Sequence, residues 1–373
     1  MDSPRPGARP AGAPRGRACF LVSLGIGAFL VLCASCEEPQ TDWTDAKNAA
    51  RPVVALTEEF GEPRPLELAC GGWEDGLYVS RDGLTLYCIY APADLLGHIV
   101  NGDDLGELHR YMRGPEFGMD LSNPDPSLEW RWLHTDLLIS ERSTTEEPFP
   151  TWRLSRMARP IFSEGAPQAV YAADGSIDWF VFTSNQTENN EDDVWVIRRP
   201  ERDPSGPGKP LPSPINTDGA EDNPHMERID EDSLVLFFDS QPRPGGAGGL
   251  DLWFSTSGDD GKTWAKPRPV ASLNSSQDDH QPHLFRSGDE WHLYYSGALA
   301  DGRSGILRAR QARAGEWGEW TDVRLVVERG GAAAIGEASL TSDGDLYFAV
   351  LSENRGGTRW DRFDCDPWVV PRR

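Results

Sequence analysis

The chain has 373 residues and a formal net charge of −24 at pH 7, and its repeated part occupies positions 51–373. That length suits one large all-β domain better than two domains, and it leaves ample material for a core. The acidity argues against nucleic acid as a partner, because binding phosphates requires a positive surface. It suits the solubility of a protein outside the cytoplasm.

Residues 1–36 have the features of a secretion signal, with a basic start, an apolar run over 18–35 and small residues at its end. The sequence Cys33-Ala-Ser-Cys36 resembles a bacterial lipobox, which implies that Cys36 is lipidated and becomes the new N-terminus. A lipid holds a protein on a membrane without crossing it. The alternative is an uncleaved anchor, because the apolar run is just long enough to span a bilayer. Glu37 resembles an outer-membrane address, so we expect an outer-membrane lipoprotein, periplasmic or surface-exposed.

Residues 37–50 are polar and predict a flexible tether. The next segment, Arg51-Pro-Val-Val-Ala-Leu56, matches Arg268-Pro-Val-Ala-Ser-Leu273, which closes one of the repeats described below. It therefore predicts a last strand that has no earlier strands of its own.

Strand-ending serines recur every 56 residues, at Ser184, Ser240, Ser296 and Ser352. A repeat of this size is typical of stacked supersecondary units. Third-strand motifs, most of them Asp-x-Trp, begin at Asp136, Asp193, Asp251, Gly305 and Asp366. The pattern predicts a five-bladed β-propeller of four-stranded antiparallel blades over 51–373.

The last blade has a third strand after Asp366 and no fourth strand. The N-terminal strand at 51–56 can complete it, which would remove the open sheet edges that a linear array exposes. Blade one has extra residues at about 92–132, which we interpret as an insertion rather than a sixth blade.

One face of such a propeller gathers the blade-opening acids, the insertion and the loops between second and third strands. Variable loops on a rigid scaffold are where binding is expected. Our candidates for catalytic carboxylates are Glu74, Glu164, Asp222 and Asp279. Two of them could act as acid and base in glycoside cleavage. The alternative, which the repetition favours, is that each acid holds the inner strand of its blade in place.

The predicted ligand-binding set consists of polar residues on this face. It contains Glu164, Asp222, His225, Arg243, Asp279, His283, Arg303 and Glu337. Arginine pairs with carboxylates and phosphates, so inward-pointing arginines would select a ligand that carries a carboxylate. Acids beside histidines also suit a cation. A structural cation in the channel therefore stays open, although we predict no metal site and no cofactor.

The segment Ser257-Gly-Asp-Asp-Gly-Lys-Thr-Trp264 matches the Asp-box pattern Ser-x-Asp-x-Gly-x-Thr-Trp. Asp259 can accept backbone hydrogen bonds, Gly261 can adopt a left-handed conformation, and Trp264 can pack beneath the turn. The motif falls on a turn between third and fourth strands, on the face opposite the acids. We therefore interpret it as structural.

Three of the six cysteines lie in the signal, which leaves Cys70, Cys88 and Cys365. Cys70 and Cys365 both fall near the predicted closure, and a site outside the cytoplasm permits a disulfide. We predict that bond, with free buried thiols as the alternative.

Three segments resemble the repeats of TolB-like propellers: Ser80-Arg-Asp-Gly-Leu-Thr-Leu-Tyr87, Ser342-Asp-Gly-Asp-Leu-Tyr-Phe348 and Gly246-Ala-Gly-Gly-Leu-Asp-Leu-Trp253. This resemblance implies a propeller outside the cytoplasm that binds proteins or glycans, and it brings no catalytic residues with it. The Asp box resembles that of sialidases. The strand Glu290-Trp-His-Leu-Tyr-Tyr-Ser-Gly297 and the five blades resemble glycosidases of the arabinanase and fructosidase type, which implies separated acids around the channel.

We therefore expect a membrane-anchored monomer that binds a cell-envelope glycan or a protein partner at the acidic channel face, without chemistry. The alternative is a glycoside hydrolase-like enzyme that uses carboxylates at the channel mouth. The two readings differ in whether those carboxylates face an open pocket or are all engaged by backbone amides.

Overall fold

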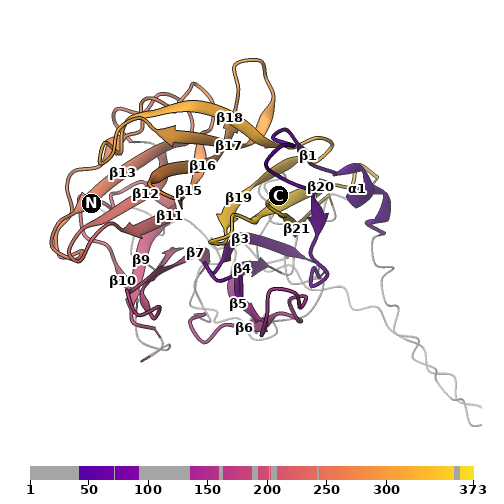
Figure 1. The fold of residues 1–373 in the computed structure, drawn as a ribbon, viewed down its shortest axis with the longest axis horizontal. Coiled ribbons are helices and arrows are strands. Elements are labelled where there is room, and N and C mark those ends of the chain that lie inside the picture. The colour runs from indigo at the N-terminus through magenta and orange to yellow at the C-terminus, as the bar shows by residue number, and fades with distance from the viewer. Residues whose placement is uncertain are drawn as a thin grey trace, which may run out of the picture. The chain divides into compact units, whose positions relative to one another are not determined.

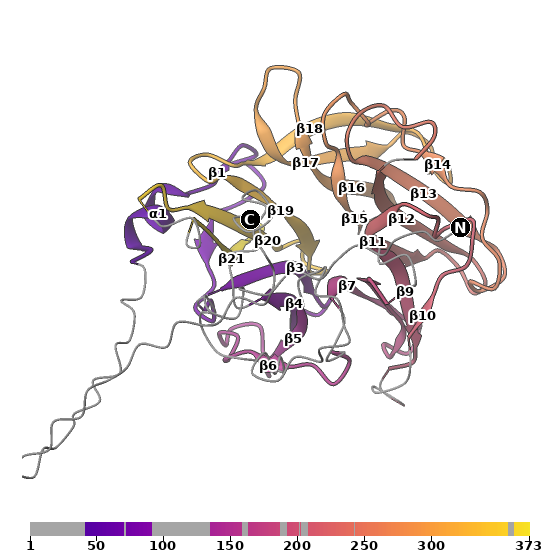
Figure 2. The same cartoon turned by 180° about the vertical axis from the view of Figure 1, so that it is seen from behind.

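A computed structural model describes residues 42–70, 72–91, 135–158, 163–186, 192–200, 202, 208–241, 243–356 and 362–373. The chain divides into two units, Met1–Gln40 and Thr41–Arg373, and every strand belongs to the second (Figures 1 and 2). Among the described residues, no helix has both the length and the apolar character needed to cross a membrane. The predicted signal, Cys36 and the insertion at 92–132 lie outside the described residues.

The strands follow one another in groups of antiparallel neighbours. The first group is β3 (Trp73–Val79), β4 (Thr85–Ala91), β5 (Asp136–Glu141) and β6 (Arg153–Leu154). The second is β7 (Glu164–Tyr171), β8 (Ile177–Ser184), β9 (Asp193–Arg198) and β10 (Lys209–Pro210). The third is β11 (Ala220–Arg228), β12 (Leu234–Gln241), β13 (Asp251–Ser257) and β14 (Arg268–Pro269).

The fourth group is β15 (His280–Ser287), β16 (Glu290–Ala298), β17 (Ser304–Gln311) and β18 (Trp320–Glu328). The last group along the chain is β19 (Ala334–Leu340), β20 (Leu346–Glu353) and β21 (Phe363–Val370). A single parallel pair, Cys365 with Trp73, joins β21 to β3, so the first and last groups form one eight-stranded sheet.

The first strand of each group lies nearest the middle of the folded unit, and the later strands lie further out (Figure 1). These inner strands contact one another in a ring, from β3 to β7, β11, β15, β19 and back to β3. The hydrophobic clusters fill the space between neighbouring groups. For example, Phe237 of β12 packs with Leu293 of β16 and Trp320 of β18. The inner strands therefore surround one axis, with their starts at one end of it and their ends at the other.

Two of the recurring serines, Ser184 and Ser240, hold neighbouring strands together. Ser184 Oγ donates to the carbonyl of Ser163 at 2.9 Å, and Ser240 Oγ donates to the carbonyl of Ala220 at 2.7 Å. Each bond links the end of a second strand to the start of the first strand beside it. A scaffold contact of this kind explains why the residue returns at a constant spacing.

The N-terminal segment joins the sheets differently from the prediction for 51–56. Its strand β1 (Val53–Val54) pairs with β18 as a fifth strand, and β2 (Arg64–Pro65) is the strand that pairs with β21. Between β1 and β2, the side chains of Leu56 and Phe60 are buried in a hydrophobic cluster, which holds the connecting segment against the sheets. The match with 268–273 was misleading because a basic residue followed by proline also opens β2 and β10. Proline is tolerated on such edges because it lacks the N–H that an inner strand would need.

Part of the predicted tether belongs to the folded unit. Residues Thr44–Ala49 form the helix α1, and Ala50 after it is buried. Lys47 Nζ lies 2.8 Å from Asp364 Oδ2 and 2.7 Å from Asp366 Oδ1, on either side of Cys365. These ion pairs attach the helix to β21.

The Asp box forms the turn between β13 and β14 and makes the contacts expected of a structural motif. Asp259 Oδ1 accepts hydrogen bonds from the Ser257 hydroxyl at 2.9 Å and the Thr263 N–H at 2.8 Å. Gly261 has a φ of +72°, and a Cβ there would lie 2.8 Å from the Trp179 ring. Trp264 is buried beneath the turn.

Replacing Gly261 by alanine is expected to lower the free energy of unfolding by about 1–3 kcal/mol, because the side chain would meet Trp179 in a left-handed conformation. Gly258 in the same turn has open space around it, which makes Gly258→Ala the matched control. Urea unfolding followed by circular dichroism measures both variants. Equal midpoints for the two variants would contradict this account of the turn.

Candidate functional site

Every inner strand has a β-bulge at the same point. The register shifts lie between Asp75 and Tyr78, Gly165 and Gln168, Asp222 and His225, His280 and His283, and Gly336 and Ser339. The residue at the bulge has a positive φ in each case: Gly76 (58°), Ala166 (39°), Asn223 (50°), Gln281 (56°) and Glu337 (60°). Left-handed residues other than glycine are uncommon, and bulges often redirect side chains next to active sites.

The bulges surround a narrow channel along the middle of the ring. Its cavity of about 30 Å³ is lined by residues of all the inner strands, among them Leu77, Ala166, Asn223, Gln281 and Glu337. Because the residues before each bulge belong to the starts of the inner strands, polar groups there gather at one end of the channel.

Four carboxyl groups meet at this end: Asp75, Asp222, Asp239 and Glu337. We call them the axial carboxylates. Three come from the starts of inner strands, and Asp239 comes from β12, where it pairs with Asp222 of β11. Asp239 is fully buried, whereas the other three are half-buried. The cluster is therefore deep in the ring yet partly accessible.

Two amide side chains at the bulges organise this cluster. Gln281 Nε2 donates to Glu337 Oε1 at 2.5 Å, and Gln281 Oε1 accepts from the Ser296 hydroxyl at 2.7 Å. Asn223 Nδ2 donates to Asp239 Oδ2 at 2.9 Å, and the backbone N–H of Gln281 donates to the same oxygen at 2.8 Å. Gln281 therefore contacts two of the four carboxyl groups at once.

The remaining two carboxylates accept hydrogen bonds on one oxygen each. Asp222 Oδ1 accepts from the Thr183 hydroxyl and from the Asn223 N–H, both at 2.7 Å. Asp75 Oδ2 accepts from the Trp73 indole at 3.1 Å. These donors set the direction of each carboxylate.

Burial and mutual repulsion oppose ionisation of the cluster. Burial, and then the neighbouring Asp222, raises the pKa of Asp239 to about 8. Burial, followed by Asp75, Asp222 and Asp239, raises the pKa of Glu337 well above its usual range. A proton donor and hydrogen-bond acceptors thus lie close together, which is the arrangement that acid and base catalysis needs.

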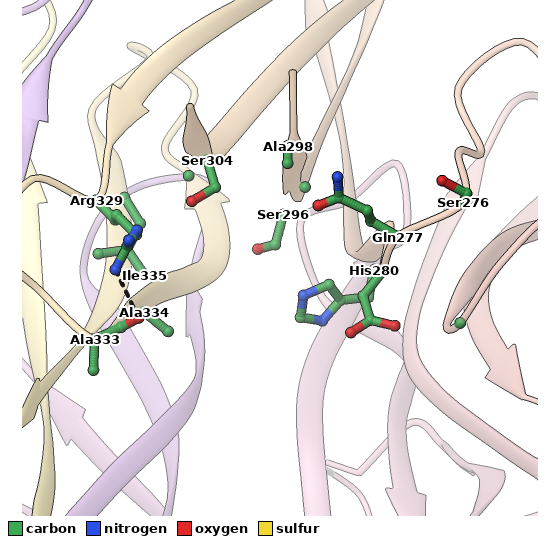
Figure 3. Close-up of a pocket in the computed structure, with 14 residues that line it drawn as sticks. Ser276, Gln277, His280, Ser296, Ala298, Ser304, Arg329, Ala333, Ala334 and Ile335 are labelled. Carbon is green, nitrogen blue, oxygen red and sulfur yellow. Dashed lines mark hydrogen bonds between the residues drawn. The ribbon is translucent and has the colours of Figure 1, made fainter. Parts of the chain in front are cut away.

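A larger cleft of about 600 Å³ opens beside the cluster, between the loops of the fourth and last groups. Figure 3 shows Arg329 and Ala333 to Ile335 on one side and His280 and Gln277 on the other. Arg329 Nη1 donates to the carbonyls of Ala332 and Ala333 at 3.0 and 3.4 Å. His280 and Ser296 line the cleft and flank Gln281, so the cleft and the axial carboxylates share a wall. Burial lowers the pKa of His280, which favours its neutral form.

Two of the predicted catalytic acids, Glu74 and Asp279, and the neighbouring acid Glu221 hold the scaffold instead, as the alternative interpretation proposed. Each accepts a hydrogen bond from the backbone N–H four residues earlier: Glu74 from Cys70 at 2.7 Å, Glu221 from Thr217 at 2.7 Å and Asp279 from Ser275 at 2.6 Å. Here Glu221 replaces its neighbour Asp222 as the scaffold acid of β11. Glu164 occupies the equivalent position in β7 and is equally buried. Asp222 is therefore the member of the predicted catalytic set that lies among the axial carboxylates.

The predicted arginine ligands also have other partners. Arg243 is half-buried and donates to Glu221 at 3.2 Å and to the carbonyls of Pro214 and Ile215. Arg303 is exposed and pairs with Asp301 at 2.9 Å. Within the described residues, neither lines the cavities above. These two arginines therefore do not point into the channel or the cleft as a ligand-binding set.

The predicted histidine ligands lie at the other end of the channel. His225 and His283 are buried, and their rings meet edge to face with centroids 4.3 Å apart. Glu337 is the other member of the ligand-binding set that joins the axial carboxylates. Sequence reasoning missed Asp239, Asn223 and Gln281, and it did not single out Asp75. The sequence signal that could have found Asn223 and Gln281 is the proline that follows each of them.

The predicted disulfide is not formed in the structure, where Cys70, Cys88 and Cys365 are all free. The Cys70 backbone N–H donates to Glu74 Oε1, and burial followed by the Glu74 carboxylate raises the pKa of its thiol. Cys70 therefore faces the scaffold acid, while Cys365 is buried in the pair between β21 and β3. In the described part of the chain, no group of three or more histidine, cysteine or acidic residues has the arrangement of a metal site.

Comparison with known proteins gives a likeness in fold. No protein-family model and no curated protein matches the chain. The catalytic domain of the Coprinopsis cinerea GH62 α-L-arabinofuranosidase superposes with a TM-score of 0.51 at 11% identity, covering 83% of this chain and 95% of that one. The chain has a β-propeller fold.

Other glycoside hydrolases match this propeller less closely. The Podospora anserina α-L-arabinofuranosidase in complex with cellotriose gives a TM-score of 0.46 at 12% identity, covering 82% of this chain and 94% of that one. A thermostable family-43 glycoside hydrolase gives 0.47 at 12% identity, with coverages of 82% and 92%. At such identities the likeness concerns the fold alone, and the TolB-like resemblance stays a prediction.

Two adjacent acids of β11 provide a direct test of the division between scaffold and site. Glu221→Ala should lower the free energy of unfolding by about 3–5 kcal/mol, because it leaves Arg243, whose side chain is only 9% exposed, without its ion-pair partner. Asp222→Asn should change it by less than about 1 kcal/mol, since it removes one charge from a repelling cluster. Urea unfolding of both variants gives the comparison. Equal losses would show that the two acids do not have separate roles.

Proposed function

We propose that the chain is a closed five-bladed β-propeller that hydrolyses a glycosidic bond at its axial carboxylates. The ring of contacts among the inner strands, each with its bulge, supports five blades. The pairing of β2 with β21, at the position of a fourth strand, supports closure. Propellers commonly remove their open edges in this way.

The observation that carries the proposal is a set of four carboxyl groups, three of them half-buried, that meet at one end of the channel beside an open cleft. The scaffold acids differ from this set, because each of them accepts a hydrogen bond from the backbone N–H four residues earlier. We assign Glu337 as the general acid, since burial and the neighbouring carboxylates raise its pKa and so favour its protonated form. Gln281 is its positioning residue.

The proposed reaction has two proton transfers, one to the glycosidic oxygen and one from the attacking water. Glu337 gives its proton to the glycosidic oxygen as the bond between that oxygen and the sugar carbon breaks. Asp222, directed by Thr183 and Asn223, stabilises the positive charge that develops on the sugar and takes a proton from the attacking water. The water oxygen forms the new bond to carbon, and the proton on Asp222 returns to solvent or to Glu337.

The glycan class rests on two supports. The likeness in fold is to the catalytic domain of an arabinofuranosidase. The cleft beside the axial carboxylates presents hydroxyl, amide and backbone groups from Ser276, Gln277, Ser296 and Ser304, which suit the hydroxyl groups of a sugar. Ser296 of the cleft donates to Gln281, which in turn donates to Glu337, so a glycan in this cleft would lie near Glu337.

Glycan binding without hydrolysis is the second candidate, and it is the function first expected from the sequence. It is favoured by the fact that two of the four predicted catalytic acids, Glu74 and Asp279, are engaged by backbone amides. The two candidates share the cleft and differ only in what the axial carboxylates do.

A screen of the full chain in detergent against aryl glycosides and oligosaccharides tests hydrolysis. We expect Glu337→Gln to lower kcat by about 100-fold or more, the usual contribution of a general acid. We also expect kcat/KM of the wild type to fall as the pH rises through the raised pKa of Glu337, because the required proton is then lost. The matched control is the exposed Glu316→Gln, which should keep full activity. Glycan binding with no hydrolysis of any substrate would favour the second candidate.

We further propose that Cys36 carries a lipid that anchors the protein at the outer membrane. The support is the lipobox-like sequence and the acidic residue after it. The wild type expressed in bacteria should incorporate radiolabelled palmitate and partition with membranes, whereas Cys36→Ser should do neither. Cys33→Ser serves as the control, and equal labelling of wild type and Cys36→Ser would contradict lipidation at this residue.

A further inference from the structure

A second cavity lies at the opposite end of the channel, where the inner strands finish. It has a volume of about 220 Å³ and is lined by residues from the ends of β3, β11, β15 and β19 and by Trp291 of β16. We call it the basal cavity. His225 and His283 line both the channel and this cavity, so the basal cavity lies on the same axis as the carboxylates but beyond the histidines.

The charge of the basal cavity is opposite to that of the rest of the molecule. Its lining contains Arg81, Arg228 and Arg286, and Glu227 is the acid among the lining residues. The whole chain has a net charge of −24. Three guanidinium groups around a small cavity in so acidic a protein favour an anionic ligand.

Two of these arginines have ion-pair partners that hold them in place. Arg81 pairs with Glu227, and Arg228 lies 2.6 Å from Asp178 and 2.8 Å from Asp260. A guanidinium that is held by one partner keeps further N–H donors for another.

Arg286 is the arginine with the weakest protein partners. Its side chain is 57% exposed, its distance to Asp289 is 3.9 Å, and its Nε donates to the carbonyl of Gly288. The guanidinium lies 5.7 Å from the centre of the Trp291 ring. A positive group next to an indole face can hold the carboxylate of a ring-shaped ligand while its apolar side rests on the aromatic ring.

A buried histidine at the cavity wall is the second, independent observation. His225 is 4% exposed, and its Nε2 makes no hydrogen bond of ordinary geometry among the described residues. The nearest acceptor, Glu227 Oε1, is 3.4 Å away. Buried polar atoms normally have a partner, and a ligand hydroxyl in the basal cavity would supply one.

We propose that the basal cavity binds a monosaccharide that carries a carboxylate, of the uronic acid class. Its carboxylate would pair with Arg286 and Arg81, its ring would lie against Trp291, and one hydroxyl would reach His225. The volume of about 220 Å³ is below that of sites for drug-sized ligands, which agrees with a single sugar unit. This site is separate from the proposed hydrolytic one and does not depend on it.

Isothermal titration calorimetry of the full chain in detergent tests the proposal with D-glucuronate, D-galacturonate, D-glucose and inorganic phosphate. We expect one site for at least one of the uronates, with glucose binding at least about tenfold more weakly. Arg286→Gln and Trp291→Ala should each weaken uronate binding about tenfold or more. Arg310→Gln, an exposed arginine of β17 outside the cavity lining, should bind as the wild type does.

Several results would overturn the basal site. They are no heat with either uronate, equal binding of glucose, binding of phosphate alone, or unchanged uronate binding by Arg286→Gln. Glu337→Gln separates this site from the hydrolytic one, because it should abolish hydrolysis and leave uronate binding intact. Loss of uronate binding in Glu337→Gln would place the anion at the axial carboxylates and contradict the proposal.

Discussion

The left-handed bulge in each inner strand is the constraint on which the candidate site depends. A regular strand alternates its side chains between two faces, so it cannot direct consecutive residues toward one axis. The bulge breaks this alternation once per strand, at Gly76, Ala166, Asn223, Gln281 and Glu337. Four of these residues are not glycine, and the cost of their conformation is offset by hydrogen bonds such as that between Gln281 and Glu337. The strain is thus concentrated where the carboxylates meet.

Neighbouring residues have different roles because the strand has a period of two up to the bulge. Glu221 is fully buried and accepts hydrogen bonds from Thr217, whereas Asp222 lies half-buried among the axial carboxylates. The same division separates Glu74 from Asp75 in β3. Acid-rich starts of inner strands therefore supply the scaffold and the site together. In each pair, one carboxylate accepts a hydrogen bond from the backbone four residues earlier and the other faces the channel.

The channel gives the propeller two chemically different ends. The starts of the inner strands bring together carboxyl groups, and burial followed by mutual repulsion raises the pKa values of Asp239 and Glu337. Their other ends carry Arg81, Arg228 and Arg286. Between them, His225 and His283 pack edge to face and close the channel to a narrow passage. A glycan at one end and an anion at the other would thus contact separate sets of residues.

The sequence by itself determined the all-β class, the repeat and the structural role of the Asp box, because these follow from local periodicity and turn chemistry. The spacing of serines such as Ser184 and Ser240 reflects hydrogen bonds within one group of strands. Only the tertiary structure decided which acids serve the site. Asp239 follows a run of apolar residues and carries no signal of its own, and Asp75 stands beside a more conspicuous scaffold acid. Their roles arise from the ring of inner strands, which brings residues that are far apart in the chain to one axis. The sequence pattern alone does not show which of these residues come close together in space.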